Sequence, residues 1–193
     1  MVLGPALAVA SYLLGSISFG LLAARRAGVD LRAEGSGNVG ATNVGRVLGK
    51  RTGRVVLLLD AAKGAIPSGL AWWLLGPDDP WTAATGALAV LGHCAPIWHA
   101  FRGGKGAATA AGVMLVLVWP AGLAAVVSYA ALKKLTRRAS VGSIVGAVLG
   151  AAIALAWLGP GPRAWMTVAI AVIVLVRHAG NLRRLLRGEE PPS

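Results

Sequence analysis

The sequence predicts an all-α integral membrane protein that forms a single polytopic domain over residues 1–193. Of these residues, 56% are hydrophobic and only 13% are charged, whereas a soluble domain carries about 25% charged residues. A water-soluble fold could not bury this much apolar surface, so the bilayer is the expected solvent. We attribute the net charge of +12 to cytoplasmic loops and expect no nucleic-acid partner.

Seven helices are expected, and most of them are apolar segments long enough to cross the bilayer, which requires about 20 residues. The five crossing segments are residues 2–24, 55–75, 81–101, 141–158 and 164–176. The last is short and spans only if the flanking arginines snorkel or the bilayer thins. The remaining stretch, 107–132, is too long for one helix and is interrupted by Pro120. It is expected to form the fourth and fifth helices, a short hairpin that need not cross completely.

The positions of the basic residues predict how these helices are oriented. All Lys and Arg residues except Lys63 and Arg163 fall in four segments. Cytoplasmic loops tend to carry the basic residues, so these segments are expected to be cytoplasmic, with the N-terminus outside and the C-terminus inside. The expected cytoplasmic loops are about 25–54, 102–106, 133–140 and 177–193. One long tilted helix in place of the hairpin would put Lys133 and its basic neighbours outside, which the rule disfavours.

The first cytoplasmic loop contains a glycine-rich segment, residues 35–46, suited to binding phosphate. Glycines such as Gly37 and Gly40 let backbone N–H groups approach a ligand closely. Ser36, Asn38 and Thr42 add side-chain donors, and Thr42 or Asn43 could cap a short helix. Arg46 adds a guanidinium fork that fits phosphate. The alternative is a flexible polar loop. We reject a dinucleotide site, because residues 35–40 follow a helix end rather than a strand.

The second glycine-rich loop, residues 101–106, repeats this chemistry. Gly103 and Gly104 precede Lys105 at the start of an expected helix, so a helix N-terminus and an ammonium group would point to one place. An ordinary cytoplasmic loop would explain the basic residues but not the glycines.

Three polar residues lie inside expected membrane spans, where such groups are costly and often functional. Asp60 and Lys63 are three residues apart on one helix face, and His93 lies on the next span. They either clamp the second and third helices together or contact substrate, and both interpretations stay open.

The last basic segment contains His178 and Asn181, which can share one helix face. Ser140 and Ser143, at the cytoplasmic start of another helix, could reach the same surface. Three further residues are assigned to lipid headgroup contact and topology: Arg183, Arg184 and Arg187. The tail, residues 189–193, is expected to be disordered. The polar features therefore converge on the cytoplasmic side, where a phosphate-bearing substrate would arrive.

Five segments together resemble the bacterial acyl-phosphate:glycerol-3-phosphate acyltransferases, the PlsY family. They are residues 35–43, 60–64, 92–96, 101–109 and 178–186, in the family's order. Residues 139–143 depart from the pattern because the family has a more serine-rich run there. That leaves Ser143 as the better-supported ligand of the run.

The resemblance implies transfer of a fatty acyl group from acyl phosphate to the 1-hydroxyl of glycerol 3-phosphate, without cofactor, metal or acyl-CoA. The product would be 1-acylglycerol 3-phosphate (lysophosphatidic acid), made in the first step of phospholipid synthesis. It also implies a multi-pass protein of the bacterial cytoplasmic (inner) membrane, active at the cytoplasmic face. The expected partners are acyl phosphate, glycerol 3-phosphate, membrane lipid and an enzyme that produces acyl phosphate.

The residues then divide into a catalytic and a substrate-binding set. The expected catalytic residues are Ser36, Asn38, Lys105 and His178. The expected substrate-binding residues are Gly37, Gly40, Thr42, Asn43, Arg46, Lys63, His93, Gly103, Gly104, Ser143 and Asn181. Donors near Gly103 and Gly104 are expected to stabilise the oxyanion. The base is either His178 or the leaving phosphate, and we favour the phosphate.

Other classes of membrane protein fit the sequence less well. A transporter or flippase would need a polar path through the whole membrane, whereas the polar residues here gather at one side. A CDP-alcohol phosphotransferase would need a carboxylate-rich metal motif, and the chain has only seven acidic residues. A purely structural membrane protein would not need two glycine-rich basic loops.

Overall fold

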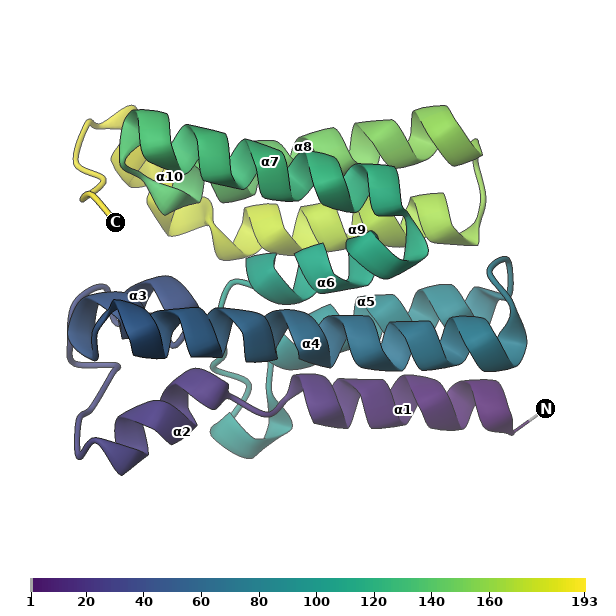
Figure 1. Cartoon of the computed structure of the whole chain (residues 1–193), viewed down its shortest axis with the longest axis horizontal. Helices are drawn as coiled ribbons and strands as arrows, with labels where there is room; N and C mark the ends of the chain where they lie inside the picture. Colours follow the sequence, from purple (N-terminus) through teal and green to yellow (C-terminus); the bar gives the residue numbers. More distant parts are fainter. Residues whose placement is uncertain (1) are drawn as a thin grey trace.

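The computed structural model describes residues 2–193, and these residues contain helices but no strands (Figure 1). The helices are α1 (Leu3–Gly15), α2 (Phe19–Arg26), α3 (Ala41–Val47), α4 (Lys50–Leu75), α5 (Pro80–Cys94), the 3-10 helix η1 (Ile97–His99), α6 (Ala107–Leu117), α7 (Trp119–Thr136), α8 (Ala139–Leu158), α9 (Pro162–Arg177) and α10 (Ala179–Leu186). The all-α prediction is confirmed. The predicted count of seven helices is wrong, because the described residues form ten α-helices.

The additional helices arise at breaks that the apolar pattern does not mark. The first predicted span is divided where the Ser18 side chain accepts a hydrogen bond from the amide of Leu21 and so caps α2. Helix α10 follows the last predicted span, in the segment predicted to be a cytoplasmic loop, and the chain bends by 58° between α9 and α10. By length and composition, Leu3–Arg26, Lys50–Leu75 and Ala139–Leu158 can each cross a membrane, and α9 with α10 would make a fourth span if the bent pair is counted as one.

The third predicted span ends earlier than expected, at Cys94 instead of Phe101. Pro96 disfavours helical geometry in the residue before it, and Ala95 accordingly leaves the helix. The chain continues through η1 and then through Ala100 and Phe101, which both have left-handed backbones with φ of 51° and 60°. This irregular segment leads into the second glycine-rich loop.

The predicted hairpin around Pro120 is present. Helix α6 ends at Leu117 and α7 begins at Trp119, and the two helices run antiparallel (Figure 1). Pro120 lies in the first turn of α7, where its missing N–H has no helical partner to lose. With 11 residues, α6 is roughly 16 Å long, well short of about 30 Å of hydrocarbon. Helix α6 is therefore too short to cross the hydrocarbon on its own.

The loops separate into two groups at opposite ends of the bundle (Figure 1). The two loops without basic residues, between α4 and α5 and between α8 and α9, share one end, where Arg163 pairs with Asp78 at 2.9 Å. Helices α2, α3 and α10 lie toward the other end. This grouping agrees with the charge pattern, and the side that faces the cytoplasm stays a prediction.

Close contact between α4 and α6 places the N-terminus of α6. A Cβ on Gly64 would overlap the carbonyl of Thr109, and one on Gly112 would overlap the carbonyl of Ala61. In membrane helices, glycines of this kind allow two backbones to touch. The first turn of α6 is thereby held beside Gly64 in the middle of α4.

Candidate active site

A cavity of about 300 Å³ lies among α3, α4, α6, α7, α8 and the segments that follow α9. Most of the predicted site residues line this one cavity: Ser36, Asn38, Gly40, Thr42, Asn43, Arg46, His93, Lys105, Ser143, His178 and Asn181. Four predicted residues are not in its wall: Gly37, Lys63, Gly103 and Gly104. The structure therefore brings both glycine-rich loops and the His178–Asn181 segment to one place.

We call the part of the cavity lined by these predicted site residues its polar end. From there the cavity continues along an apolar wall. Leu57 and Leu58 of α4 and Met114 and Leu115 of α6 line it, together with Val126 of α7. Several of these side chains also face outward: Leu58 is 69% exposed and Leu115 is 44% exposed. In a membrane protein such surface meets lipid, so the groove between α4 and the hairpin can accept an acyl chain from the bilayer.

Asn43 organises the first glycine-rich loop. Its side-chain oxygen accepts hydrogen bonds from the amide of Ser36 (2.9 Å) and the guanidinium of Arg46 (3.3 Å). Its side-chain nitrogen donates to the carbonyls of Leu31 (3.3 Å) and Glu34 (3.0 Å). Asn43 is also only 1% exposed. It therefore shapes the loop and orients Arg46, and its polar atoms are already engaged.

The short helix expected in this loop is present as α3, but its start differs from the prediction. Gly40 is the N-cap and Ala41 the first residue, so the predicted cap at Thr42 or Asn43 is wrong. Both residues lie within the helix. The Asn43 side chain donates to carbonyls of the preceding loop and so does not cap α3. Thr42 remains on the cavity wall.

The second glycine-rich loop is held from both sides. The amides of Gly103 and Gly104 donate to the carbonyls of Cys94 (3.2 Å) and His93 (3.1 Å). Their carbonyls accept hydrogen bonds from Arg177, at 2.8 Å for Gly103 and 3.0 Å for Gly104. The N–H groups of Gly103 and Gly104 are therefore already used, so the oxyanion donors expected near these residues would have to be other groups.

The first turn of α6 offers other donors. Ala107 and Ala108 line the cavity, and the first amides of a helix have no carbonyl partner within it. The hydrogen bonds from Arg177 to Gly103 and Gly104 were not predicted from the sequence, because an arginine directly after an apolar span looks like a topology signal.

Lys105 reaches from this loop into the polar end of the cavity. Its ammonium group donates to the side-chain oxygen of Asn181 at 2.5 Å. Burial lowers the pKa of Lys105 to about 8; Glu190 opposes this shift, and the nearby cations Arg184, Arg177 and Arg46 add to it. A phosphate group entering the cavity would bring further negative charge close to this ammonium group.

His178, between α9 and α10, is 3% exposed. Its Nδ1 lies 2.8 Å from the carbonyl oxygen of Val174. A carbonyl only accepts, so Nδ1 carries the proton and Nε2 keeps its lone pair. Burial lowers the pKa of His178 to about 4, so the ring is neutral near pH 7. It can accept a hydrogen bond from a substrate hydroxyl.

The intramembrane polar residues meet at Asp60. Its Oδ1 lies 2.9 Å from the ammonium of Lys63 and 3.6 Å from Nδ1 of His93. Lys63 also donates to the carbonyl of Ile17 at 2.7 Å, at the break between α1 and α2. Lys63 thus links α4 to the break between α1 and α2, whereas His93 borders both this cluster and the cavity.

Two residues of the polar end, Arg184 and Glu190, were not predicted to lie there, whereas Ser140 reaches this surface as expected. Ser140 hydrogen-bonds to Glu190 at 2.7 Å, and Arg184 pairs with Glu190 at 2.8 Å. The assignment of Arg184 to lipid headgroups is therefore wrong, as is the disordered tail at residues 189–193. Within residues 2–193, no three His, Cys, Asp or Glu side chains gather as a metal site would need, and the metal-free chemistry stays a prediction.

The described residues form a helical membrane bundle whose cationic pocket opens onto an apolar groove, an arrangement that suits a membrane enzyme acting on a phosphate-bearing substrate and an acyl chain. The family model described as "Glycerol-3-phosphate acyltransferase" matches residues 5–188. The chain belongs to this glycerol-3-phosphate acyltransferase family, the PlsY family.

Relatives of this chain share its length and fold. A glycerol-3-phosphate acyltransferase of Anaeromyxobacter dehalogenans (strain 2CP-1 / ATCC BAA-258) is 48% identical over 97% of this chain and 96% of the relative. One of Caulobacter vibrioides (strain NA1000 / CB15N) is 45% identical over 95% and 84%. A crystal structure of PlsY (YgiH), an integral membrane glycerol 3-phosphate acyltransferase in its glycerol 3-phosphate form, superposes with a TM-score of 0.95 at 38% identity, covering 98% of this chain and 95% of that one. The lysophosphatidic acid form gives a TM-score of 0.92 at the same identity, covering 98% and 94%.

Proposed function

We propose that this enzyme transfers a fatty acyl group from acyl phosphate to the 1-hydroxyl of glycerol 3-phosphate, giving 1-acylglycerol 3-phosphate and phosphate. This would be the first step of phospholipid synthesis. The observation that carries the proposal is the single cavity that joins a cationic polar end to a lipid-facing apolar groove. The related PlsY structures in glycerol 3-phosphate and lysophosphatidic acid forms support the same acceptor and product.

The two substrates divide the polar end between them. In this proposal the first glycine-rich loop and Lys105 hold the acyl phosphate, with Ser36, Asn38 and Thr42 as donors. The acyl chain lies along the apolar groove. A second set binds glycerol 3-phosphate: Arg46, Ser143, His178 and Asn181. Gly37, Gly103 and Gly104 contribute by shaping the loops.

The chemistry needs positioning more than activation, because acyl phosphate is already a mixed anhydride. The glycerol oxygen forms a bond to the acyl carbon, and the bond from that carbon to the phosphate oxygen breaks. The first amides of α6, at Ala107 and Ala108, stabilise the carbonyl oxygen as it gains negative charge. Lys105 balances the charge of the departing phosphate.

The proton of the glycerol hydroxyl passes to the departing phosphate, which is adjacent and sufficiently basic. His178 accepts a hydrogen bond from the hydroxyl through Nε2 and orients it. On this basis His178→Ala raises the KM for glycerol 3-phosphate more than it lowers kcat. A collapse of kcat at unchanged KM would instead identify His178 as the base.

The polar end of the cavity is proposed to face the cytoplasm from the bacterial inner membrane, where both soluble substrate and an acyl-phosphate-producing enzyme can reach it. A transporter would need polar groups along the whole bundle. A second cavity, among α5 and α9 near Pro80 and Trp165, has an apolar lining and lies at the opposite end.

The test is an acyl-transfer assay on purified protein in lipid, with glycerol 3-phosphate as acceptor, palmitoyl phosphate or palmitoyl-CoA as donor, and a chelator present. We expect turnover with palmitoyl phosphate only, and its loss in Lys105→Ala. Lys134→Ala, at an exposed lysine near the end of α7, serves as the matched control. Absence of turnover with both donors in a folded sample would refute the proposal.

A further inference from the structure

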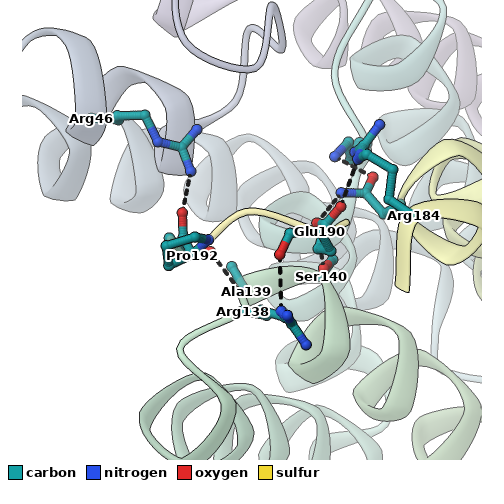
Figure 2. Close-up of polar contacts among 10 residues, drawn as sticks. Arg46, Arg138, Ala139, Ser140, Arg184, Glu190 and Pro192 are labelled. Carbon is teal, nitrogen blue, oxygen red and sulfur yellow. Dashed lines mark hydrogen bonds and ion pairs between the residues drawn. The ribbon is translucent and has the colours of Figure 1, made fainter. Parts of the chain in front are cut away.

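The segment that follows α10, residues 188–193, folds back over the cavity, and we call it the strap (Figure 2). Gly188 turns the chain with a φ of 73°. Its amide donates to the carbonyl of Leu185 at 3.1 Å, and the amide of Glu189 donates to Arg184 at 2.8 Å. These bonds end α10 and direct the following residues inward.

The carboxylate of Glu190 lies in the polar end of the cavity and is surrounded by donors. One oxygen accepts from Ser140 (2.7 Å) and from the side-chain nitrogen of Asn181 (2.5 Å), and the other accepts from Arg184 (2.8 Å). Asn181 in turn accepts from Lys105. Glu190 is only 7% exposed. A buried anion with this many donors occupies the kind of place that a phosphate group requires.

The backbone of the strap is held as well (Figure 2). Arg46 of α3 donates to the carbonyl of Pro192 at 2.8 Å, and Arg138 donates to the carbonyl of Glu190 at 3.0 Å. The amide of Ala139 donates to the side-chain oxygen of Ser193 at 2.7 Å. The strap therefore connects α3 to the start of α8 and covers the polar end between them.

The strap uses donors that the substrates also need. Arg46, which donates to the Pro192 carbonyl, and Asn181, which donates to the Glu190 carboxylate, are both assigned above to glycerol 3-phosphate. The strap and a phosphate group would compete for these hydrogen bonds, and the Glu190 carboxylate would also repel the phosphate. An ordinary structural ion pair would not need to lie inside the substrate cavity.

We propose that the Glu190 carboxylate occupies the phosphate subsite for glycerol 3-phosphate in the unliganded enzyme, and that the strap lifts when the substrate enters. The inference rests on the proposed function for the identity of the substrate. The strap acts as an intramolecular competitor: it lowers the fraction of enzyme open to substrate and raises the apparent KM in proportion.

The first test is Glu190→Gln, which keeps the shape of the side chain and removes its charge. We expect the KM for glycerol 3-phosphate to fall about tenfold, because a mostly closed strap reduces apparent affinity by the open fraction. The control is Glu189→Gln, whose side chain is exposed, and it keeps the wild-type KM. A Glu190→Gln enzyme with an unchanged or higher KM would overturn the proposal.

The second test locks the strap with a disulfide between Ala139→Cys and Ser193→Cys, since these residues touch in the closed position. Oxidation is expected to abolish turnover, and a reductant is expected to restore it in the same sample. Each single-cysteine variant controls for oxidation of Cys94. Full turnover in the oxidised double variant would show that the strap does not block the substrate.

A binding measurement separates failure of this inference from failure of the proposed function. Inorganic phosphate binding is measured by equilibrium dialysis with wild type, Glu190→Gln and Glu189→Gln. Tighter phosphate binding by Glu190→Gln supports the strap even if wild type shows no acyl transfer, which would refute only the proposed function. Equal phosphate binding by all three proteins, together with active wild type, would refute only the strap.

Discussion

Replacing Arg177 by lysine is expected to lower kcat/KM about tenfold without changing the net charge. The guanidinium holds the carbonyls of Gly103 and Gly104 at 2.8 and 3.0 Å. A lysine ammonium lacks the planar fork and cannot hold both in this geometry. Hydrogen bonds from a charged group contribute about 1.5–3 kcal/mol. Arg177 is exposed, so we take about 1.5 kcal/mol, which corresponds to about a tenfold effect.

The assay for this variant is the initial rate with palmitoyl phosphate at glycerol 3-phosphate concentrations below KM, in the same lipid as wild type. Arg183→Lys is the matched control, because Arg183 is exposed on α10 and its side chain makes no hydrogen bond within the described chain. A folded Arg177→Lys enzyme with wild-type kcat/KM would show that the guanidinium does not position the loop that carries Lys105.

Three further predictions concern charge, space and burial. Lys105 has a pKa of about 8, so its ammonium group is present below that pH. We therefore expect kcat/KM to fall as the pH rises through 8. Lys105→Arg stays charged, so its kcat/KM should not fall over this pH range. Gly104→Ala places a methyl group against the His93 ring and is expected to lower acyl-transfer activity at least tenfold. Gly161→Ala places its methyl group in open space and should leave the activity unchanged. Asp60→Asn breaks a buried ion pair with Lys63 and is expected to lower the free energy of unfolding by about 3–5 kcal/mol. An unchanged melting temperature of the variant in lipid would contradict this prediction.

The sequence predicted the parts of this protein that depend on composition and on local motifs. Apolar runs gave the main helices, and the separation of basic from neutral loops gave the hairpin around Pro120. The glycine-rich loops and the His178–Asn181 segment marked the residues that line the cavity. Each of these signals is a local motif or the distribution of residue types along the chain, so it can be recognised without a fold.

The features that were missed depend on partners distant in the sequence. Ser18 starts a new helix inside an apolar run, and nothing in that run marks the break except one capping residue. Arg177 and Arg184 look like topology signals until the carbonyls and the carboxylate they contact are known. A charged tail next to a basic helix looks disordered, because its order comes from donors on α3, α8 and α10.

The strap also explains, in electrostatic terms, how Lys105 keeps its proton in a buried pocket surrounded by other cations. Burial and the surrounding cations favour loss of the Lys105 proton, and the negative charge of Glu190 opposes that loss. Burial opposes ionisation of Glu190 itself, but its hydrogen bonds from Asn181, Ser140 and Arg184 outweigh that effect and lower its pKa. A phosphate that displaces Glu190 brings at least as much negative charge. One anion is therefore exchanged for another, and Lys105 stays protonated through the exchange.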